Sequence, residues 1–557
     1  MFTMDSLVFL AIAVAILFAA VQRGGDGART MSEKTHRAIC GAAIAAGVLV
    51  RLARLTSLPA GISAEEALVG VQAKALWQTG GFLFGQGLTT QLSQWAGETT
   101  GPLLAVLTAP FVGLFGMSKL TVRLPLALLS CAAMPAAYGL GEALSGRRAA
   151  RWMLLIAALC PIFVLEARMT CGSCAALYLL PIALCLIARG VTKPAALYPG
   201  MIVLALTAYT QDMYFFIAPA AILACAIIAL IFGRRKRHAV ISGTIGLLLC
   251  VPAMLTAFVN LTGAEGMTLL GLIRIPRLEG FEKAFMAENR SVGDKLWAVL
   301  IGGVFQVLRH ENIHQAMYTP DGMLALFMFS LPLMVLGALA LFARWTDGRR
   351  AAREKAAARA MVAATCAVTL AALVMFGSVG TLNTNGTTGL FDHSALILFD
   401  AVLMTAGLCT IERKNLRCAA AMVALMAVNF AWLAVQLFGG SYQANANVYF
   451  PGFEQMAARA AEIQAETGEK INVTGNIYPH IQPSDGAEMM FLYATDADMR
   501  TAEAERGTRY ETIYVSDDMQ PEADQIYLAR ADEISNWDLE GFDYEESEGY
   551  ALIYPAR

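Results

Sequence analysis

Long apolar segments recur along this chain of 557 residues and leave few folds open to it. A helix needs about 20 predominantly apolar residues to cross the hydrocarbon core of a bilayer, and by that criterion we count about twelve candidate spans. Charged residues make up only 15% of the chain, against about 25% in an average soluble domain, so one soluble core could not bury this much apolar surface. We therefore expect an all-α, polytopic membrane domain. The predicted spans are 6–22, 38–57, 120–141, 150–167, 173–189, 195–210, 214–232, 239–259, 322–343, 359–379, 392–410 and 417–437.

Basic residues gather in the short segments that follow alternate predicted spans. Because loops rich in Lys and Arg remain in the cytoplasm, we place these segments there and both chain termini outside. The first span has no basic leader and is followed by positive charges, which favours an uncleaved, N-outside anchor over a signal peptide. The predicted location is the plasma (inner) membrane. Basic residues confined to such loops offer no surface for nucleic acid. The basic segments are 23–37, 146–151, 233–238, 343–359 and 411–417.

Three long segments fall on the outer side under this topology, namely 58–119, 260–321 and the tail 441–557. The first two contain helix-like stretches that are too short or too polar to span, so we expect them to lie along the membrane interface. Trp77 and Trp95 would then lie at the level of the lipid headgroups. These stretches are 65–79, 101–116, 281–289 and 292–308.

The tail is acidic, whereas the rest of the chain is basic. From Ser441 onward there are 23 acidic and 7 basic side chains, and the preceding residues hold 21 acidic and 34 basic ones. A helical period runs over 453–467 and ends at Gly468, and four short runs are typical of strands. We expect a small C-terminal α/β domain of roughly 100 residues outside the membrane. The strand-like runs are 470–474, 512–516, 525–529 and 550–554.

This organisation divides the chain into three regions. Residues 1–37 form an N-terminal anchor helix and a cytoplasmic loop, 38–440 form the transmembrane domain, and 441–557 form the outer domain. All 11 cysteines lie between Cys40 and Cys418, so none falls in the tail and no disulfide framework is expected.

Two adjacent carboxylates, Glu65 and Glu66, follow the second predicted span directly on the outer side. Ser63 is suited to cap the helix that starts here, and acidic residues are favourable in a first helical turn. The pair is therefore explained either as a helix start or as a general base that takes a proton from a hydroxyl group. Neighbouring residues on a helix point about 100° apart, so the two carboxylates need not have the same role.

The order of several short motifs resembles one class of membrane enzymes, the glycosyltransferases of the type-C fold. Within that class the chain is similar to the group of protein O-mannosyltransferases and lipid A aminoarabinose transferases. The resemblance covers about residues 38–260 well and the later spans loosely. The motifs are Arg51-Leu52, Leu58-Pro59-Ala60-Gly61, Glu65-Glu66, Gly101-Pro102-Leu103-Leu104, Leu114-Phe115-Gly116, Val122-Arg123-Leu124-Pro125, Pro161 and Glu166-Ala167-Arg168.

The resemblance implies a role for three of these residues. Glu65 stands where the family has its catalytic Asp and would be the general base. Glu66 matches the family Glu and would orient the acceptor or neighbouring groups. Arg168 matches an Arg at the outer end of a span and would face the lipid phosphate, for which the forked guanidinium is well suited. The chain departs from the family pattern at 170–174, where an acidic residue is missing, and beside 383–386, where an Arg is missing.

Other polar residues are candidates for the same outer cavity. Arg51 and Arg54 lie at the outer end of a predicted span, where they either reach to the headgroups or contact the donor phosphate. His393 is a further candidate for that phosphate. His310 and His314 are spaced i, i+4, as metal ligands on a helix would be, but the sequence offers no third ligand, so we predict no metal site and leave a divalent cation open. The candidates for lining the cavity or binding the acceptor are Asp212, Trp95, His314, Asp321, Asn383 and Asn385.

The function that this implies is an inverting transfer of a hexose or pentose from a polyprenyl-monophosphate carrier to a hydroxyl group outside the cytoplasm. The acceptor would be a glycan, a lipid or a protein. Two alternatives remain open: a secondary transporter or flippase of an envelope lipid or solute, and a non-catalytic homologue that acts in envelope assembly. A transporter would bind its substrate with polar groups near the membrane midplane, whereas the polar groups here gather at the outer ends of the spans.

Overall fold

The computed structural model describes most of the chain, and several predicted site residues lie outside the described part. Among these are Trp95, Asp212, His314, Asp321, Asn383, Asn385 and His393, together with the predicted helices 281–289 and 292–308. The described residues are 4–22, 31–83, 85–93, 99–171, 174–211, 213–277, 293, 325–346, 353–376, 394–439, 450–476, 485–516 and 519–556.

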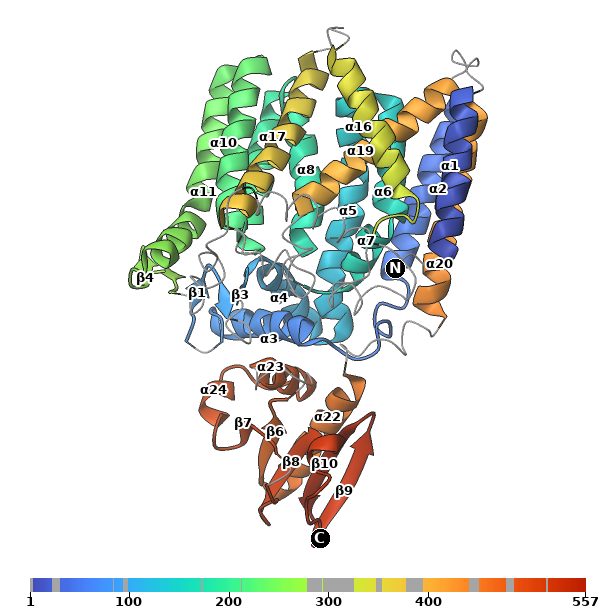
Figure 1. Cartoon of the computed structure of the whole chain (residues 1–557). Helices are drawn as coiled ribbons and strands as arrows, with labels where there is room; N and C mark the ends of the chain where they lie inside the picture. Colours follow the sequence, from blue (N-terminus) through green and yellow to red (C-terminus); the bar gives the residue numbers. More distant parts are fainter. Residues whose placement is uncertain are drawn as a thin grey trace.

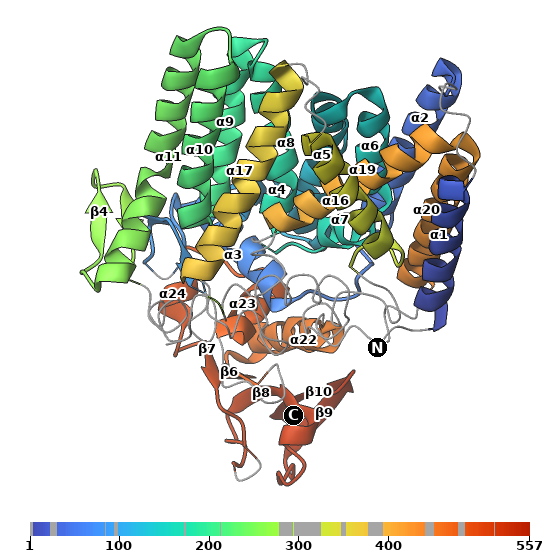
Figure 2. The same ribbon diagram turned by 45° about the horizontal axis from the view of Figure 1, so that its top comes forward.

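A bundle of apolar helices forms the body of a multi-pass membrane protein (Figures 1 and 2). Within the described ranges, seven helices are long and apolar enough to cross a bilayer, and a bent pair makes an eighth. The seven are α2 Glu33–Leu52, α5 Lys119–Ser145, α10 Tyr214–Phe232, α11 Lys236–Thr262, α17 Arg353–Phe376, α19 Ser394–Lys414 and α20 Leu416–Phe438. The bent pair is α6 Arg147–Leu159 and α7 Pro161–Leu165, which is extended to Arg168 by the 3-10 helix η2 Glu166–Arg168.

Four further predicted spans coincide with apolar helices whose apolar parts are only 10–17 residues long. The prediction of about twelve spans is therefore met only in part by length and composition. These shorter helices are α1 Met4–Gln22, α8 Ala175–Gly190, α9 Leu197–Leu206 and α16 Ser330–Thr346.

The two helices expected in the first outer segment are present as α3 Ala64–Thr79 and α4 Leu103–Phe115. Both lie between the helical body and the tail (Figure 1). Short strands accompany them. β1 Leu88–Thr89, β5 Ile273–Ile275 and β4 Met267–Leu269 form one small sheet in that order, and β2 Leu92–Ser93 pairs with β3 Thr99–Thr100. Trp77 in α3 is half exposed, and its place at the level of the lipid headgroups stays a prediction.

The tail contains a five-stranded sheet in the order β7-β6-β8-β10-β9. Neighbours β7, β6 and β8 run parallel, whereas β8, β10 and β9 pair antiparallel. One face of the sheet packs on helices and includes Ile526, Leu528 and Leu552, while the alternate residues Tyr527 and Ile553 face Trp537. The elements in chain order are α22 Pro451–Thr467, β6 Lys470–Thr474, α23 Asp485–Ala494, α24 Ala502–Glu505, β7 Tyr510–Ile513, β8 Gln525–Arg530, β9 Phe542–Ser547 and β10 Tyr550–Pro555.

Several tail elements match the prediction, whereas the helices α23 and α24 and the strand β9 were missed. β6 has the predicted bounds, and α22 ends before Gly468, whose positive φ of 79° suits glycine. The strand β9, Phe-Asp-Tyr-Glu-Glu-Ser, escaped prediction because its residues are mainly acidic and polar at the edge of the sheet.

The tail and the helices α3 and α4 share one hydrophobic core. Leu68 and Val71 of α3 cluster with Phe453 of α22 and with Met490 and Tyr493 of α23. The tail is thus packed directly on α3, which begins with the Glu65-Glu66 pair.

Candidate functional site

Glu66 is a buried structural anchor at the start of α3. Arg123 of α5 donates from Nε and Nη2 to its two carboxylate oxygens, each at 2.8 Å. The main-chain N–H of Thr170 donates to the same carboxylate at 3.2 Å and that of Ser63 at 3.3 Å, while the Ser63 hydroxyl accepts from the Glu66 N–H. Glu66 is 1% exposed and Arg123 is fully buried. The predicted cap at Ser63 is therefore a complete capping box, and Glu66 joins three parts of the chain.

Arg123 also fixes the loop that leads into α3. Its Nη1 donates to the carbonyls of Leu55 and Pro59 at 3.1 and 3.0 Å, and its Nη2 donates to that of Gly61 at 2.9 Å. A guanidinium group carries five donors in a rigid fork, so one side chain can bond both a carboxylate and several carbonyls. The loop 55–61 and the first turn of α3 are thus held to α5 as one unit.

Arg168 holds the other end of this loop. Its Nη1 donates to the carbonyls of Val50 and Ala53 at 2.6 and 3.0 Å, and its Nη2 donates to that of Leu58 at 2.8 Å. The last carbonyls of a helix have no partner within the helix, and a cation is favourable there. Arg168 therefore caps α2 and is 1% exposed. Its role as a phosphate ligand stays a prediction.

Arg51 lies at the break between α6 and α7. Pro161 has no N–H for the carbonyl of Ala157, and the N–H of Ile162 donates to Ala325 instead of Ala158. The Arg51 guanidinium occupies both carbonyls, donating to Ala157 at 2.7 Å and to Ala158 at 3.1 Å. Arg51 is fully buried. Its predicted contact with a donor phosphate also stays a prediction.

Glu65, next to the anchored Glu66, has quite different surroundings. Its side chain is partly exposed. It interacts electrostatically with Glu166, which is buried at the end of the bent helix pair and accepts a hydrogen bond from the Cys174 thiol at 2.8 Å. The site thus has one carboxylate that solvent reaches and a second, buried carboxylate that interacts with it electrostatically. Glu66 is enclosed by its bonds to Arg123, Thr170 and Ser63, whereas the side chain of Glu65 is partly exposed.

Arg54 is an exposed cation in the same loop. It has a positive φ of 52°, uncommon for a residue other than glycine, asparagine or aspartate. Its carbonyl accepts from the N–H groups of Ser57 and Leu58, which closes a tight turn directly after α2. Unlike Arg51 and Arg168, its side chain reaches solvent.

Sequence reasoning did not assign roles to Arg123 and Glu166, although both stand in motifs that carried the resemblance. An arginine inside a 27-residue apolar helix was the available signal for Arg123. A carboxylate two residues before Arg168 was the corresponding signal for Glu166. No group of three or more His, Cys, Asp or Glu side chains that could hold a metal ion occurs among the described residues.

No protein-family model and no curated protein sequence matches the chain. Solved structures match it by fold. ArnT from Cupriavidus metallidurans bound to undecaprenyl phosphate superimposes with a TM-score of 0.52 and 10% identity, over 94% of this chain and 98% of ArnT. The chain has the type-C glycosyltransferase fold.

A second solved structure is similar at a lower score. The oligosaccharyltransferase AglB from Archaeoglobus fulgidus, in complex with an inhibitory peptide and a dolichol-phosphate, superimposes with a TM-score of 0.44 and 12% identity. The match covers 83% of this chain and 63% of AglB, so the chain spans just under two thirds of that protein's length. The type-C fold agrees with the family that the motif order at residues 51–168 indicated.

Proposed function

We propose that this protein is a membrane glycosyltransferase that moves a sugar from a polyprenyl-monophosphate carrier to a hydroxyl group on the outer face of the membrane. The type-C fold supports the class, since the ArnT structure with this fold holds undecaprenyl phosphate. The observation that carries the proposal is the division between Glu65 and Glu66. The Glu66 carboxylate is held by Arg123 in a buried ion pair, and the Glu65 carboxylate next to it is partly exposed.

Glu65 is the general base in this proposal. Its carboxylate takes the proton from the acceptor hydroxyl as the oxygen attacks the anomeric carbon. The bond between that carbon and the phosphate oxygen breaks, and polyprenyl phosphate leaves with the electron pair. Attack from the face opposite the phosphate inverts the configuration.

The donor phosphate needs a positive partner, because charge builds on it as the sugar leaves. Arg54 meets this requirement best among the arginines of this loop, since it is exposed whereas Arg51 and Arg168 donate to carbonyls. We propose that Arg54 contacts the phosphate and that Arg168 and Arg51 shape the loop that presents it. The acceptor, which is a glycan, a lipid or a protein, approaches from the side of the tail.

The outer-side location of this site, with both termini outside, remains part of the proposal. The N-terminal end of α1 and the tail lie toward the same end of the helical body (Figures 1 and 2), which supports an even number of passes. In the plasma membrane this end would face away from the cytoplasm, as the predicted topology with its basic cytoplasmic segments requires.

The test is transfer by purified protein in nanodiscs, with a series of polyprenyl-phosphate sugars as donors. We expect Glu65→Gln to lower kcat by at least about 100-fold, the scale of a lost general base, with the protein still folded in the membrane. Glu265→Gln is the matched control, since Glu265 is an exposed carboxylate beyond the end of α11. It should transfer at the wild-type rate.

Wild-type rates in Glu65→Gln would exclude Glu65 as the base. A wild-type protein that binds the donor without transfer would instead favour the non-catalytic homologue. Solute uptake into vesicles that is insensitive to Glu65→Gln would favour the transporter.

A further inference from the structure

One face of α3 links the Glu66–Arg123 ion pair to the tail. Glu66, Gly70, Lys74 and Gln78 are spaced four residues apart, so they form a stripe along the helix. Glu66 at the first turn is bonded to Arg123 of the helical body. The remaining three positions of the stripe all contact the tail.

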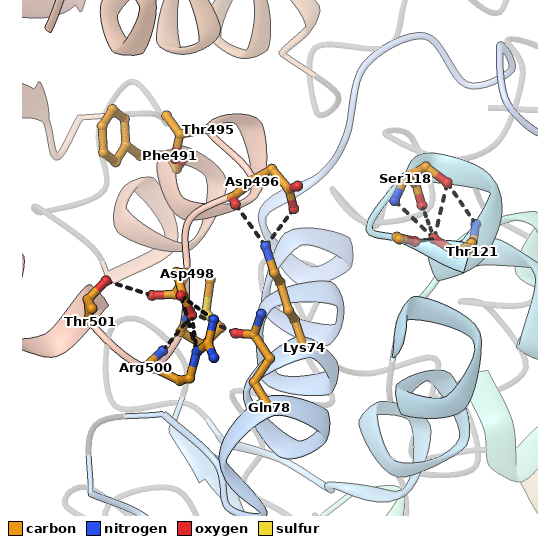
Figure 3. Close-up of polar contacts among 12 residues, drawn as sticks. Lys74, Gln78, Ser118, Thr121, Phe491, Thr495, Asp496, Asp498, Arg500 and Thr501 are labelled. Atoms are coloured by element: carbon orange, nitrogen blue, oxygen red, sulfur yellow. Dashed lines mark hydrogen bonds and ion pairs between the residues drawn. The ribbon is translucent and has the colours of Figure 1, made fainter. Parts of the chain in front are cut away.

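Lys74 is bonded twice to a single tail residue. Its Nζ donates to the Asp496 carboxylate at 2.6 Å and to the Asp496 carbonyl at 2.8 Å (Figure 3). Asp496 has a positive φ of 47°, in the turn that ends α23. Aspartate tolerates this conformation better than most residues. The left-handed turn therefore presents a carbonyl and a carboxylate to the same ammonium group.

Gln78 extends this contact by one helical turn. Its side-chain oxygen accepts from the main-chain N–H of Met499 at 2.9 Å. The segment 496–500 is itself stiffened by Arg500, which bonds both carboxylate oxygens of Asp498 (Figure 3). Three successive bonds thus join the second half of α3 to one short segment of the tail.

Gly70 allows the tail to approach α3 closely. A Cβ at this position would lie 3.3 Å from the ring of Tyr493 and 2.9 Å from a methyl group of Val122. The Tyr493 ring is buried, and burial followed by the nearby Glu454 and Glu66 carboxylates raises the pKa of its hydroxyl. The α23 helix of the tail therefore reaches the neighbourhood of the Glu66–Arg123 pair itself.

We propose that the tail is a positioning element of the active site. By holding Lys74 and Gln78 and by packing Tyr493 against Gly70, it fixes the rotation and axial position of α3 and so the direction of Glu65. This inference rests on the proposed function. Lys74, Gln78, Tyr493 and Asp496 are positioning residues, since they act through α3. A displacement of about 1 Å at a catalytic group can lower a rate by about 100-fold.

The test combines hydrogen exchange with kinetics in the full-length protein. Lys74→Met removes both bonds, and Asp496→Asn is the milder variant, because it keeps the left-handed turn and the carbonyl acceptor and removes only the charge. Lys470→Met is the matched control, since Lys470 pairs with Glu511 within the tail sheet. We expect Lys74→Met to speed amide exchange in residues 64–79 and to lower kcat by about 10-fold to 100-fold, with the KM for the donor unchanged. Asp496→Asn should change amide exchange and kcat in the same directions but less. Lys470→Met should change neither quantity.

Two outcomes would overturn the positioning role. The first is exchange in residues 64–79 that stays at the wild-type rate in both variants. The second is faster exchange with unchanged kcat. The exchange measurement does not require activity. If the wild-type protein transfers no sugar, the proposed function fails. A comparison of amide exchange in residues 64–79 between the wild type and Lys74→Met still shows whether the tail holds this helix.

Discussion

Glu65 and Glu66 are neighbours in sequence with different surroundings, and the difference comes from one arginine. Arg123 approaches α3 from the side that Glu66 faces, and a helix turns the next carboxylate by about 100°. The sequence suggested the cap at Ser63, because Ser followed three residues later by Glu is a local pattern. The partner at position 123 is 57 residues away and was not predictable, since one sequence gives no distance between segments.

The same limit applies to the buried arginines. The resemblance implied that Arg168 faces the lipid phosphate, and Arg51 was expected either to reach the headgroups or to contact that phosphate. The structure bonds both to main-chain carbonyls. Which carbonyls lack a partner depends on where α2 ends and where α6 breaks, and helix ends are the least predictable part of a sequence-based assignment.

Loss of the Glu66–Arg123 pair should destabilise the protein, in contrast to loss of Glu65. Removing one partner of a buried ion pair leaves the other charge buried and costs about 3–5 kcal/mol. We expect Arg123→Met and Glu66→Gln to lower the Tm in detergent clearly, and Glu65→Gln to leave it near the wild-type value. Equal Tm values for Glu66→Gln and Glu65→Gln would contradict the structural role of Glu66.

At the scale of elements, helix breaks and close helix crossings shape the body. Pro161 lies at the 60° bend between α6 and α7, where it has no N–H to continue the helix. The sequence analysis placed one unbroken span, 150–167, across this bend. The contact between α16 and α19 was not predictable, because Gly337 and Gly407 are ordinary residues in their segments. Small residues let two membrane helices approach closely.

The crossing of α16 and α19 gives a prediction of its own. A Cβ on Gly337 would lie 1.9 Å from the carbonyl oxygen of Leu403, and one on Gly407 would lie 2.3 Å from that of Leu333. A backbone carbonyl cannot move aside as a flexible side chain can, so the added methyl group would clash with it. Gly337→Ala should therefore destabilise the protein by about 3 kcal/mol. Gly41→Ala is the control, since its added methyl group meets no neighbour and should even add up to about 1 kcal/mol of helix stability. Detergent unfolding curves measure both, and an unchanged Gly337→Ala protein would contradict this packing.

At the scale of the whole molecule, the tail and the membrane body meet at α3. The sequence predicted an acidic outer region from its charge and several of its strands from their composition. It did not predict that this region shares a core with the outer helices, because Leu68 and Phe453 are far apart in the chain. The type-C fold followed from the order of motifs rather than from any one of them.

The account depends on a lipid-linked phosphosugar meeting Glu65 at the outer surface. A density map of the protein with a bound polyprenyl-phosphate sugar tests this most directly. We predict the phosphate beside Arg54, with the sugar between it and the Glu65 carboxylate and the lipid chain running into the helical body. A lipid phosphate at the cytoplasmic end of the bundle, or a Glu65 carboxylate turned away from the bound sugar, would contradict it.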